Sequence, residues 1–305
     1  MKTLREHISE AVTSRKAIGH FNICTMDGVW AVVDAAKELK VPVIIGVSEG
    51  ERDYVGLNEI AAVVRTIREE RGQEVFLNAD HTYSFERVKE AIDAGYDSVI
   101  FDGAKLSLEE NIKITKQCVE YAKEHAARSR ELGTTPSSTA IPSSLPIIEG
   151  ELGFIGTSSK VLDDIPEGAA VGEAMMTKPE EAARFVAESG VDMLAPAVGN
   201  IHGIIRGGDP ALNAKRVKEI SGAVKIPLVL HGASGNSASD IRKCIEAGVA
   251  IVHVNTELRV AFRSGLVKSL QENPEEIAAY KYLKPAKLAM QKIVEEKLRI
   301  ISNRV

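Results

Sequence analysis

VFLNADH, at residues 75–81, is an apolar, strand-like run that ends in an aspartate and a histidine. Two other apolar runs also end in a histidine: LAPAVGNIH at residues 194–202 and PLVLH at residues 227–231. The carboxyl ends of all strands of a parallel barrel meet on one face. His81, His202 and His231 are therefore expected to be neighbours in the folded chain, although they are far apart in the sequence.

Short apolar runs alternate with longer segments of helical period along the whole chain. The predicted strands are residues 17–23, 41–47, 75–79, 98–101, 145–149, 193–198, 227–230 and 251–254. The predicted helices are residues 28–39, 57–71, 84–94, 107–132, 179–189, 210–221, 238–247 and 257–270. Eight strand–helix pairs with nearly continuous apolar strands predict an α/β fold, a closed (β/α)8 TIM barrel forming a single domain over residues 1–305. The remaining helical stretches, 275–280 and 284–301, predict a C-terminal helical extension.

Two segments beside the fifth predicted strand interrupt this alternation of predicted strands and helices. Residues 133–144 and 153–177 are rich in Ser, Thr, Pro and Gly, and we expect a surface loop at each end of that strand. The second loop would lie on the face where the carboxyl ends of the strands meet, which makes it a candidate lid.

The composition excludes several classes of protein. Of 305 residues, 44% are hydrophobic and 27% are charged, as in a globular protein. The net charge is −5 and there is no long basic run, which argues against a nucleic-acid partner. Cys24, Cys118 and Cys244 are widely separated and form no C-x-x-C pair, so neither a disulfide framework nor a thiolate zinc site is expected. A reduced compartment fits this pattern best.

The N-terminus gives no sign of export. The sequence MKTLREH lacks the apolar core of a signal peptide, and no stretch of the chain is long enough to span a bilayer. The cytoplasm is therefore the expected location, and no membrane partner is expected.

The three strand-end histidines predict a metal site. A single histidine after a strand is more often a structural residue, but three imidazoles that meet in one cleft can bind Zn²⁺ and leave a coordination position open. His81, His202 and His231 are each followed by a small residue, which leaves room for a ligand. His7, His20 and His125 lack this placement, and we expect them to be surface or packing residues.

Three carboxylates are expected near these histidines. Asp80 directly precedes His81, and its place at a strand end favours a general acid/base that is aimed at a substrate. It could instead orient a metal ligand or cap the loop. Asp102 and Glu151 end the fourth and fifth predicted strands. Either of them could cap a turn, but with the histidines they could also hold the metal in a second position or orient its ligands.

The seventh and eighth predicted strands are followed by turns that could bind an anion. HGASG occupies residues 231–235, and Asn255-Thr256 follows the last strand. Glycine-rich turns at a helix start leave backbone N–H groups free for an anion, and this is the usual phosphate site of a barrel. The same residues could also form a plain tight turn.

Eight short motifs are spread along most of the chain. They are FN (21–22), VSEG (47–50), ADH (79–81), FDG (101–103), EGELG (149–153), AVGNIHG (197–203), LHGASG (230–235) and TELR (256–259). In this order they resemble the class II, zinc-dependent fructose-bisphosphate and tagatose-bisphosphate aldolases.

The resemblance implies a role for each matching residue. His81, His202 and His231 would bind the catalytic zinc, with Asp102 and Glu151 at positions that contact the metal in alternative arrangements. Asp80 would move the proton of the hydroxyl group that becomes the aldehyde oxygen. The substrate-binding positions implied are Asn22, Ser48, Gly203, Gly232, Ser234, His253, Asn255 and Thr256. Gly203, Gly232, Ser234 and Thr256 among them would hold the phosphate of dihydroxyacetone phosphate, often with a monovalent cation (Na⁺ or K⁺) nearby.

The sequence departs from the family's pattern at three places. Residues 156–159 read GTSS where family members carry acidic residues, one of which moves the donor's carbon-bound proton; Asp163, Asp164 or Glu167 could replace it. The family's Lys-x-Asn in the eighth strand becomes Ile251-Val252-His253. The arginine that binds the far phosphate of a bisphosphate corresponds to about Tyr280, next to Lys281.

The resemblance implies a zinc-dependent aldolase that reversibly cleaves a ketose (bis)phosphate to dihydroxyacetone phosphate and an aldehyde such as glyceraldehyde 3-phosphate. Fructose 1,6-bisphosphate is the first substrate expected. Tagatose bisphosphate, or a ketose phosphate whose aldehyde half carries no second phosphate, is a close rival. A non-catalytic aldolase-like subunit and a metal-dependent hydrolase on the same fold are also compatible with these residues. The family is usually dimeric or tetrameric, so a homodimer or homotetramer is expected, with the C-terminal extension as a plausible contact surface.

Overall fold

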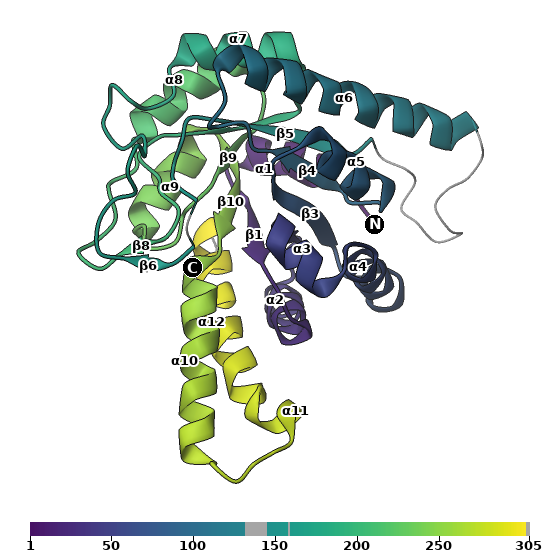
Figure 1. Ribbon diagram of the computed structural model, residues 1–305, viewed down its shortest axis with the longest axis vertical. Helices are drawn as coiled ribbons and strands as arrows, with labels where there is room; N and C mark the ends of the chain where they lie inside the picture. Colours follow the sequence, from purple (N-terminus) through teal and green to yellow (C-terminus); the bar gives the residue numbers. More distant parts are fainter. Residues whose placement is uncertain (132–144, 158, 303–305) are drawn as a thin grey trace.

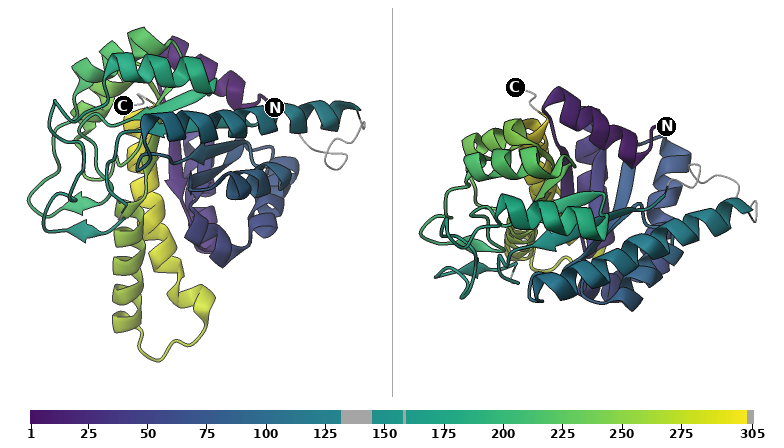
Figure 2. Two further views of the ribbon diagram at one scale, coloured as in Figure 1. Left: turned by 45° about the horizontal axis from the view of Figure 1, so that its top comes forward. Right: turned by 90° about the horizontal axis from the view of Figure 1, so that it is seen from above.

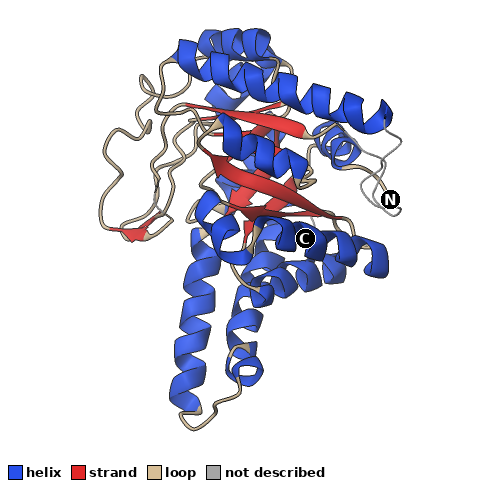
Figure 3. Ribbon diagram, turned by 45° about the vertical axis from the view of Figure 1, so that its right-hand side comes forward, coloured by secondary structure: helices blue, strands red, loops and turns tan. Residues whose placement is uncertain are grey.

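The computed structural model describes residues 1–131, 145–157 and 159–302, and within them eight parallel strands close into a barrel. The barrel strands follow one another in space as β1-β10-β9-β7-β5-β4-β3-β2. Helices surround the barrel (Figure 3), so the predicted TIM barrel is confirmed. The strands are β1 (Ile18–Asn22), β2 (Val43–Val47), β3 (Val75–Thr82), β4 (Ser98–Phe101), β5 (Ile147–Leu152), β7 (Met193–Pro196), β9 (Leu228–Leu230) and β10 (Val249–Val254).

The outer helices follow the strands as the sequence pattern predicts. They are α2 (Met26–Leu39), α4 (Leu57–Arg71), α5 (Phe85–Asp93), α6 (Leu108–Glu131), α7 (Pro179–Ser189), α8 (Ala214–Val224), α9 (Ala238–Ala247) and α10 (Thr256–Glu272). Residues that commonly cap helices mark the ends of several of them. The side chains of Thr25, Ser84 and Ser237 cap the first turns of α2, α5 and α9. Gly72 and Gly190 end α4 and α7 in the left-handed conformation that favours glycine.

Two helices were not predicted. The first, α1 (Leu4–Ser14), begins with a capping box formed by Thr3 and Glu6. Its buried residues Leu4, Ile8 and Ala11 pack against apolar side chains inside the barrel, so α1 lies across the end where the strands begin (Figure 2). The second, α3 (Glu49–Val55), immediately follows β2 and lies at the opposite end.

The barrel interior is layered, because every second residue of a strand points the same way. In β1, β3 and β5 an apolar interior residue is followed at steps of two by polar ones. The three series are Ile18, His20 and Asn22; Phe76, Asn78 and Asp80; and Ile147, Glu149 and Glu151. The apolar members pack with residues of other strands and of α1 into one cluster. The polar members consequently occupy the end of the barrel at which the strands finish.

The C-terminal helices form an arm, which agrees with the predicted extension. Helix α10 leads away from the barrel, α11 (Ala279–Tyr282) lies at the far end, and α12 (Lys284–Ile301) returns along α10 (Figure 1). The predicted helix 284–301 is found with these bounds, whereas 275–280 is replaced by the short α11 at residues 279–282. The inner end of α12 packs against α2 and β1.

The predicted loops have different outcomes. Residues 133–144, together with Leu132 and Ser158, lie outside the described residues. The segment 153–177 carries strand β6 (Val161–Leu162), which pairs in parallel with β8 (Ile204–Ile205) in a small second sheet that was not predicted. Two barrel strands, β3 and β5, continue past the ends predicted for them. As a result Asp80 and His81 lie within β3, and Glu151 lies within β5. In the described part of the chain, no helix is long and apolar enough to cross a membrane.

We expect Gly46→Ala to destabilise the barrel by about 1–3 kcal/mol, because the interior at this point is already filled. An added Cβ on Gly46 would overlap the buried imidazole of His20. Gly222→Ala in α8 is the matched control, since nothing lies within 4 Å of the added atom and alanine is the better helix former. Urea unfolding of both variants checks this. Equal stability of the Gly46 variant and the native chain would contradict the close packing.

Candidate active site

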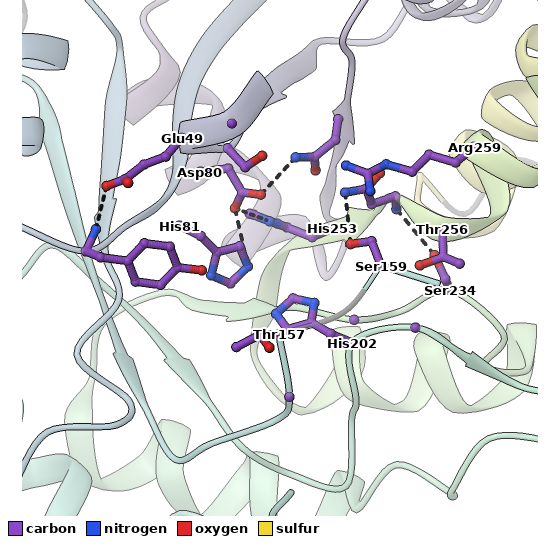
Figure 4. Close-up of a pocket in the computed structure, with 18 residues that line it drawn as sticks. Glu49, Asp80, His81, Thr157, Ser159, His202, Ser234, His253, Thr256 and Arg259 are labelled. Atoms are coloured by element: carbon purple, nitrogen blue, oxygen red, sulfur yellow. Dashed lines mark hydrogen bonds and ion pairs between the residues drawn. The ribbon is translucent and has the colours of Figure 1, made fainter. Parts of the chain in front are cut away.

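A polar pocket opens where the barrel strands finish. Figure 4 shows side chains from several strands and from α10 turned into it. It is lined by eleven of the residues predicted from the sequence and by seven others. The predicted ones are Asn22, Ser48, Asp80, His81, His202, Gly203, Gly232, Ser234, His253, Asn255 and Thr256. The others are Glu49, Gly50, Tyr83, Gly156, Thr157, Ser159 and Arg259.

Four donor groups converge beside this pocket. One ligand atom each of His81, Glu151, His202 and His231 lies within 4.8 Å of the other three. The ring planes of the histidines meet at 73°, 87° and 72°. Because the lone pair of an imidazole nitrogen lies in the plane of its ring, steeply inclined rings can direct their lone pairs at one point. The structure therefore brings the three predicted histidines and Glu151 together.

The same four groups have the chemistry of a metal site. His202 Nε2 and Glu151 Oε2 are buried and have no hydrogen-bond partner, which is unusual for buried polar atoms. Burial and the neighbouring histidines lower the pKa of His202 well below its usual value, so its ring is neutral and can act as a ligand. Burial and the charge of Asp102 raise the pKa of Glu151 to about 8. A divalent cation would satisfy both unpaired atoms, so these residues fit zinc.

Asp102 lies next to this group rather than within it. Its Oδ2 is 2.9 Å from Nδ1 of His81, and its Oδ1 accepts a hydrogen bond from the backbone N–H of Ala104. Asp102 is thus placed to fix the orientation of the His81 ring, whose Nε2 lies 3.3 Å from Nδ1 of His231 and whose Nδ1 lies 3.4 Å from Oε2 of Glu151.

A buried glutamate that was not predicted holds His231. Nε2 of His231 donates to Oε1 of Glu149 at 2.9 Å, and both side chains are 1% exposed. This bond leaves Nδ1 of His231 directed toward His81 Nε2 at 3.3 Å and Glu151 Oε2 at 3.8 Å. Burial raises the pKa of Glu149 in spite of the opposing effect of His231. The sequence signal that could have found it is the E-x-E spacing of residues 149 and 151, which puts both side chains on the same face of β5.

Two further ligand combinations are excluded by ring geometry. His20, Asp80 and His253 lie close together, as do Glu149, His231 and His253. The rings of His20 and His253 are stacked 3.4 Å apart at 4°, and those of His253 and His231 are 4.1 Å apart at 20°. The in-plane lone pairs of parallel rings cannot meet at one ion. The rings of His20, His253 and His231 are therefore a packed stack of imidazoles rather than a metal site. Among the described residues, the group around His81 and His202 is the one with converging rings.

Asp80 is a buried carboxylate beside the metal-ligand group. Its Oδ2 accepts a hydrogen bond of 2.9 Å from Asn22. Its Oδ1 has no hydrogen-bond partner and lies 3.5 Å from His253 Nδ1 and 3.8 Å from His81 Nε2. Burial alone would raise the pKa of Asp80, but the nearby histidines hold it well below its usual value. An ionised carboxylate with an unpaired oxygen at a pocket wall can accept a proton.

A second residue that was not predicted, Arg52, fixes the backbone around His81. His81 has a φ of +36°, and the register between β3 and β4 shifts between Ala79 and Thr82. Arg52 is 1% exposed and donates to the carbonyl oxygen of Asp80 at 3.2 Å and to Oγ1 of Thr82 at 3.1 Å. Arg52 therefore holds the chain in place on both sides of His81, whose positive φ is strained.

The opposite part of the pocket is suited to an anion. Thr256 is the first residue of the 17-residue helix α10, whose N-terminus attracts negative charge. Ser234 Oγ accepts from the backbone N–H of Asn255 at 3.3 Å, which ties the two turns together. Gly232 has a φ of +60°, and an added Cβ there would overlap the backbone of Ile201. Only glycine allows this close approach of the two loops.

The residues considered as replacements for missing family groups lie elsewhere. Asp163, Asp164 and Glu167 are exposed and do not line the pocket, and Asp163 is paired with Arg206 at 2.7 Å. The segment 153–177 contributes Gly156, Thr157 and Ser159 to the pocket instead.

The positions expected to bind a far phosphate are also remote from the pocket. Tyr280 and Lys281 lie in α11 at the far end of the arm (Figure 1), and Lys281 forms an ion pair with Glu276 at 3.0 Å. Neither residue reaches the pocket of its own chain. Of the histidines expected to be surface or packing residues, His20 is a packing residue inside the barrel, and His125 lies near Asp93.

The buried His20 predicts a stability loss in acid. Burial lowers its pKa to about 4, whereas a histidine in an unfolded chain has a pKa of about 6.5. The unfolded state therefore binds more protons between these values, and folding stability falls as the pH decreases through this window. We expect His20 to account for about 2 kcal/mol of the loss between pH 7 and pH 5. Urea unfolding at both pH values should show a smaller drop for His20→Gln than for the native chain. Equal drops would contradict a neutral buried imidazole.

Comparison with known proteins agrees with this geometry. The family model for fructose-bisphosphate aldolase class-II matches residues 2–304. A fructose-bisphosphate aldolase of Geobacillus stearothermophilus is 35% identical over 301 residues, which span 97% of this chain and 95% of the relative. One from Staphylococcus epidermidis is 32% identical over 300 residues, which span 97% of this chain and 96% of the relative. The solved structure of the YdjI aldolase from Escherichia coli K12 has a TM-score of 0.77 and 29% identity, covering 99% of this chain and 97% of that one. The chain therefore belongs to the class II fructose-bisphosphate aldolase family, whose members are aldehyde-lyases.

Proposed function

We propose that this chain is a cytoplasmic, zinc-dependent aldolase that reversibly cleaves a ketose (bis)phosphate to dihydroxyacetone phosphate and an aldehyde. The observation that carries the proposal is the convergence of His81, His202, His231 and Glu151 directly beside the buried carboxylate of Asp80. Fructose 1,6-bisphosphate is the first ketose to assay, because curated relatives are named for it.

The metal-ligand group supplies the electrophile of the proposed reaction. A zinc ion held by His81, His202, His231 and Glu151 would polarise a carbonyl oxygen of the substrate as a Lewis acid. Glu149 and Asp102 keep His231 and His81 in the orientations that leave their ligand nitrogens free.

Asp80 is the proton-transfer group in this proposal. In the cleavage direction Oδ1 of Asp80 accepts the proton of the hydroxyl group whose oxygen becomes the aldehyde oxygen, and in condensation it returns that proton. The hydrogen bond from Asn22 holds the other carboxylate oxygen, so Oδ1 stays directed at the pocket. The pKa of Asp80 lies well below its usual value, so the carboxylate is ionised and ready to accept.

The phosphate of the donor half is assigned to the turns at the start of α10. Gly203, Gly232, Ser234, Asn255 and Thr256 line this part of the pocket. The helix N-terminus and the hydroxyl groups of Ser234 and Thr256 favour an anion there. A monovalent cation, Na⁺ or K⁺, bound near this phosphate is part of the proposal.

We further propose that the arm formed by α10, α11 and α12 joins copies of the chain into a homodimer or homotetramer. It projects from the barrel (Figure 1) and exposes Val267, Leu270 and Ile277. Apolar side chains gathered on a projecting element support a contact between copies.

The proposed activity is tested by measuring release of dihydroxyacetone phosphate from fructose 1,6-bisphosphate and from its epimer tagatose 1,6-bisphosphate. We expect turnover by the zinc-loaded protein and loss of turnover after chelation. Asp80→Asn should keep its zinc but lose kcat by roughly 100-fold or more, because the proton acceptor is gone. A protein that binds no zinc and releases no product from any ketose phosphate would support the non-catalytic subunit instead.

Zinc affinity separately tests the role of Glu149. Glu149→Gln should weaken zinc binding by about 10- to 100-fold, because His231 loses the carboxylate that fixes its ring. His231→Ala removes a ligand and should abolish tight binding. Glu188→Gln, on the exposed face of α7, is the control for loss of one negative charge. Competition with a chelating dye measures all three variants. An unchanged affinity in Glu149→Gln would mean that the hydrogen bond does not support the site.

A further inference from the structure

The part of the pocket beyond Asp80 receives the aldehyde half of the substrate if the proposed reaction is correct. The donor half is accounted for by the metal ligands and by the turns around Ser234 and Thr256. The hydroxyl group that reacts lies at Asp80, so the remaining carbons extend along the other lining residues. Glu49, Asp80 and Arg259 lie along one side of the pocket, opposite His202 and Thr157 (Figure 4).

The guanidinium group on this lining is already paired. Among the arginines and lysines of the described residues, Arg259 alone lines the pocket. Its Nη2 lies 2.6 Å from Oε1 of Glu51, whose side chain is 6% exposed. An arginine that binds a substrate phosphate usually offers its donors to that phosphate, and here the Nη2 donor and the charge are engaged by a protein carboxylate.

Glu51 is a fixed anion rather than a mobile counter-charge. Its Oε2 accepts from the backbone N–H and the hydroxyl group of Ser48, both at 2.8 Å, and from Asn22 at 2.9 Å. Glu51 and Arg259 also line a second, mainly apolar hollow, and the Arg259 side chain is 45% exposed. The hollow is lined in part by Ile23, Leu258, Phe262 and Met290.

The local charge therefore disfavours a second phosphate. A phosphate dianion beside Arg259 would meet its positive charge together with the negative charge of Glu51. The ion pair carries no net charge, so the dianion would lose hydration there without an unpaired cation to compensate for it. Hydroxyl groups have no such penalty, since they can donate to the carboxylates of Asp80 and Glu49 and to the hydroxyl oxygen of Ser48, all of which line the pocket.

We propose that the aldehyde half of the substrate is an unphosphorylated hydroxyaldehyde, and that Glu51 excludes a second phosphate by neutralising Arg259. The physiological ketose is then a 1-phosphate rather than a bisphosphate. This inference rests on the proposed aldolase activity and narrows its substrate.

Matched substrate pairs that differ only in the second phosphate test this specificity. The pairs are fructose 1-phosphate with fructose 1,6-bisphosphate, tagatose 1-phosphate with tagatose 1,6-bisphosphate, and, in condensation, glyceraldehyde with glyceraldehyde 3-phosphate. With the native zinc-loaded protein, we expect kcat/KM for the singly phosphorylated ketose to equal or exceed that for the bisphosphate. A higher kcat/KM for the bisphosphate in the faster pair overturns the inference and leaves the aldolase activity standing. No product from any pair overturns the proposed activity itself, and the inference with it.

A variant of Glu51 tests the cause. Glu51→Gln keeps the shape and the hydrogen bonds to Ser48 and Asn22 but releases Arg259, so the ratio of kcat/KM for bisphosphate to that for monophosphate should rise by about 10-fold or more. The ratio cancels any loss of activity that both substrates share. Asp53→Asn removes a charge from the same helix, where Asp53 is exposed and pairs with Arg87 away from the pocket, and it should leave the ratio unchanged. A ratio that does not change in Glu51→Gln overturns the role of the ion pair.

Discussion

Buried carboxylates at the carboxyl end of this barrel must find partners among buried imidazoles, and the rest of the site depends on that pairing. An ionised carboxylate is costly to remove from water unless opposite charge or hydrogen bonds replace the lost hydration. Glu149 pairs with His231, Asp102 pairs with His81, and Asp80 lies between His81 and His253. After these pairs are made, Glu151 Oε2 and His202 Nε2 still have no hydrogen-bond partner. The charge that completes the site is therefore one that a bound cation would supply.

The fold tolerates this concentration of polar groups because it separates them from the apolar part of the interior. Phe76, Ile147 and other interior residues near the start of the strands pack with α1 into an apolar layer. This layer anchors the strands, so their far ends can carry polar side chains without losing the core. Arg52 adds a local support, because its hydrogen bonds on both sides of His81 hold a backbone conformation that histidine rarely adopts.

The two halves of the pocket differ in whether their positively polarised groups are free to bind an anion or are already paired with a carboxylate. In the part proposed for the donor phosphate, the start of α10 and the turn containing Gly232 present dipoles and hydroxyl groups, which favour an anion. In the part proposed for the aldehyde, the cation Arg259 is bound to a glutamate that is itself held by Ser48 and Asn22. Family membership describes the class of reaction, whereas this ion pair bears on the choice of substrate. Substrate choice within a shared fold depends on such local charges rather than on the barrel.

The barrel, the convergence of His81, His202 and His231, and the place of Asp80 could be predicted from the sequence. Strand period and the common direction of parallel strands are properties that local patterns record. The sequence did not determine which groups those residues contact. Glu149 meets His231 across 82 residues, and Glu51 meets Arg259 across 208. Strand ends also depended on neighbours, since β3 and β5 continue past their apolar runs where adjacent strands still pair with them. Only the closed barrel decided these partners, because contacts between residues from distant strands and helices arise from three-dimensional packing and have no period in the sequence.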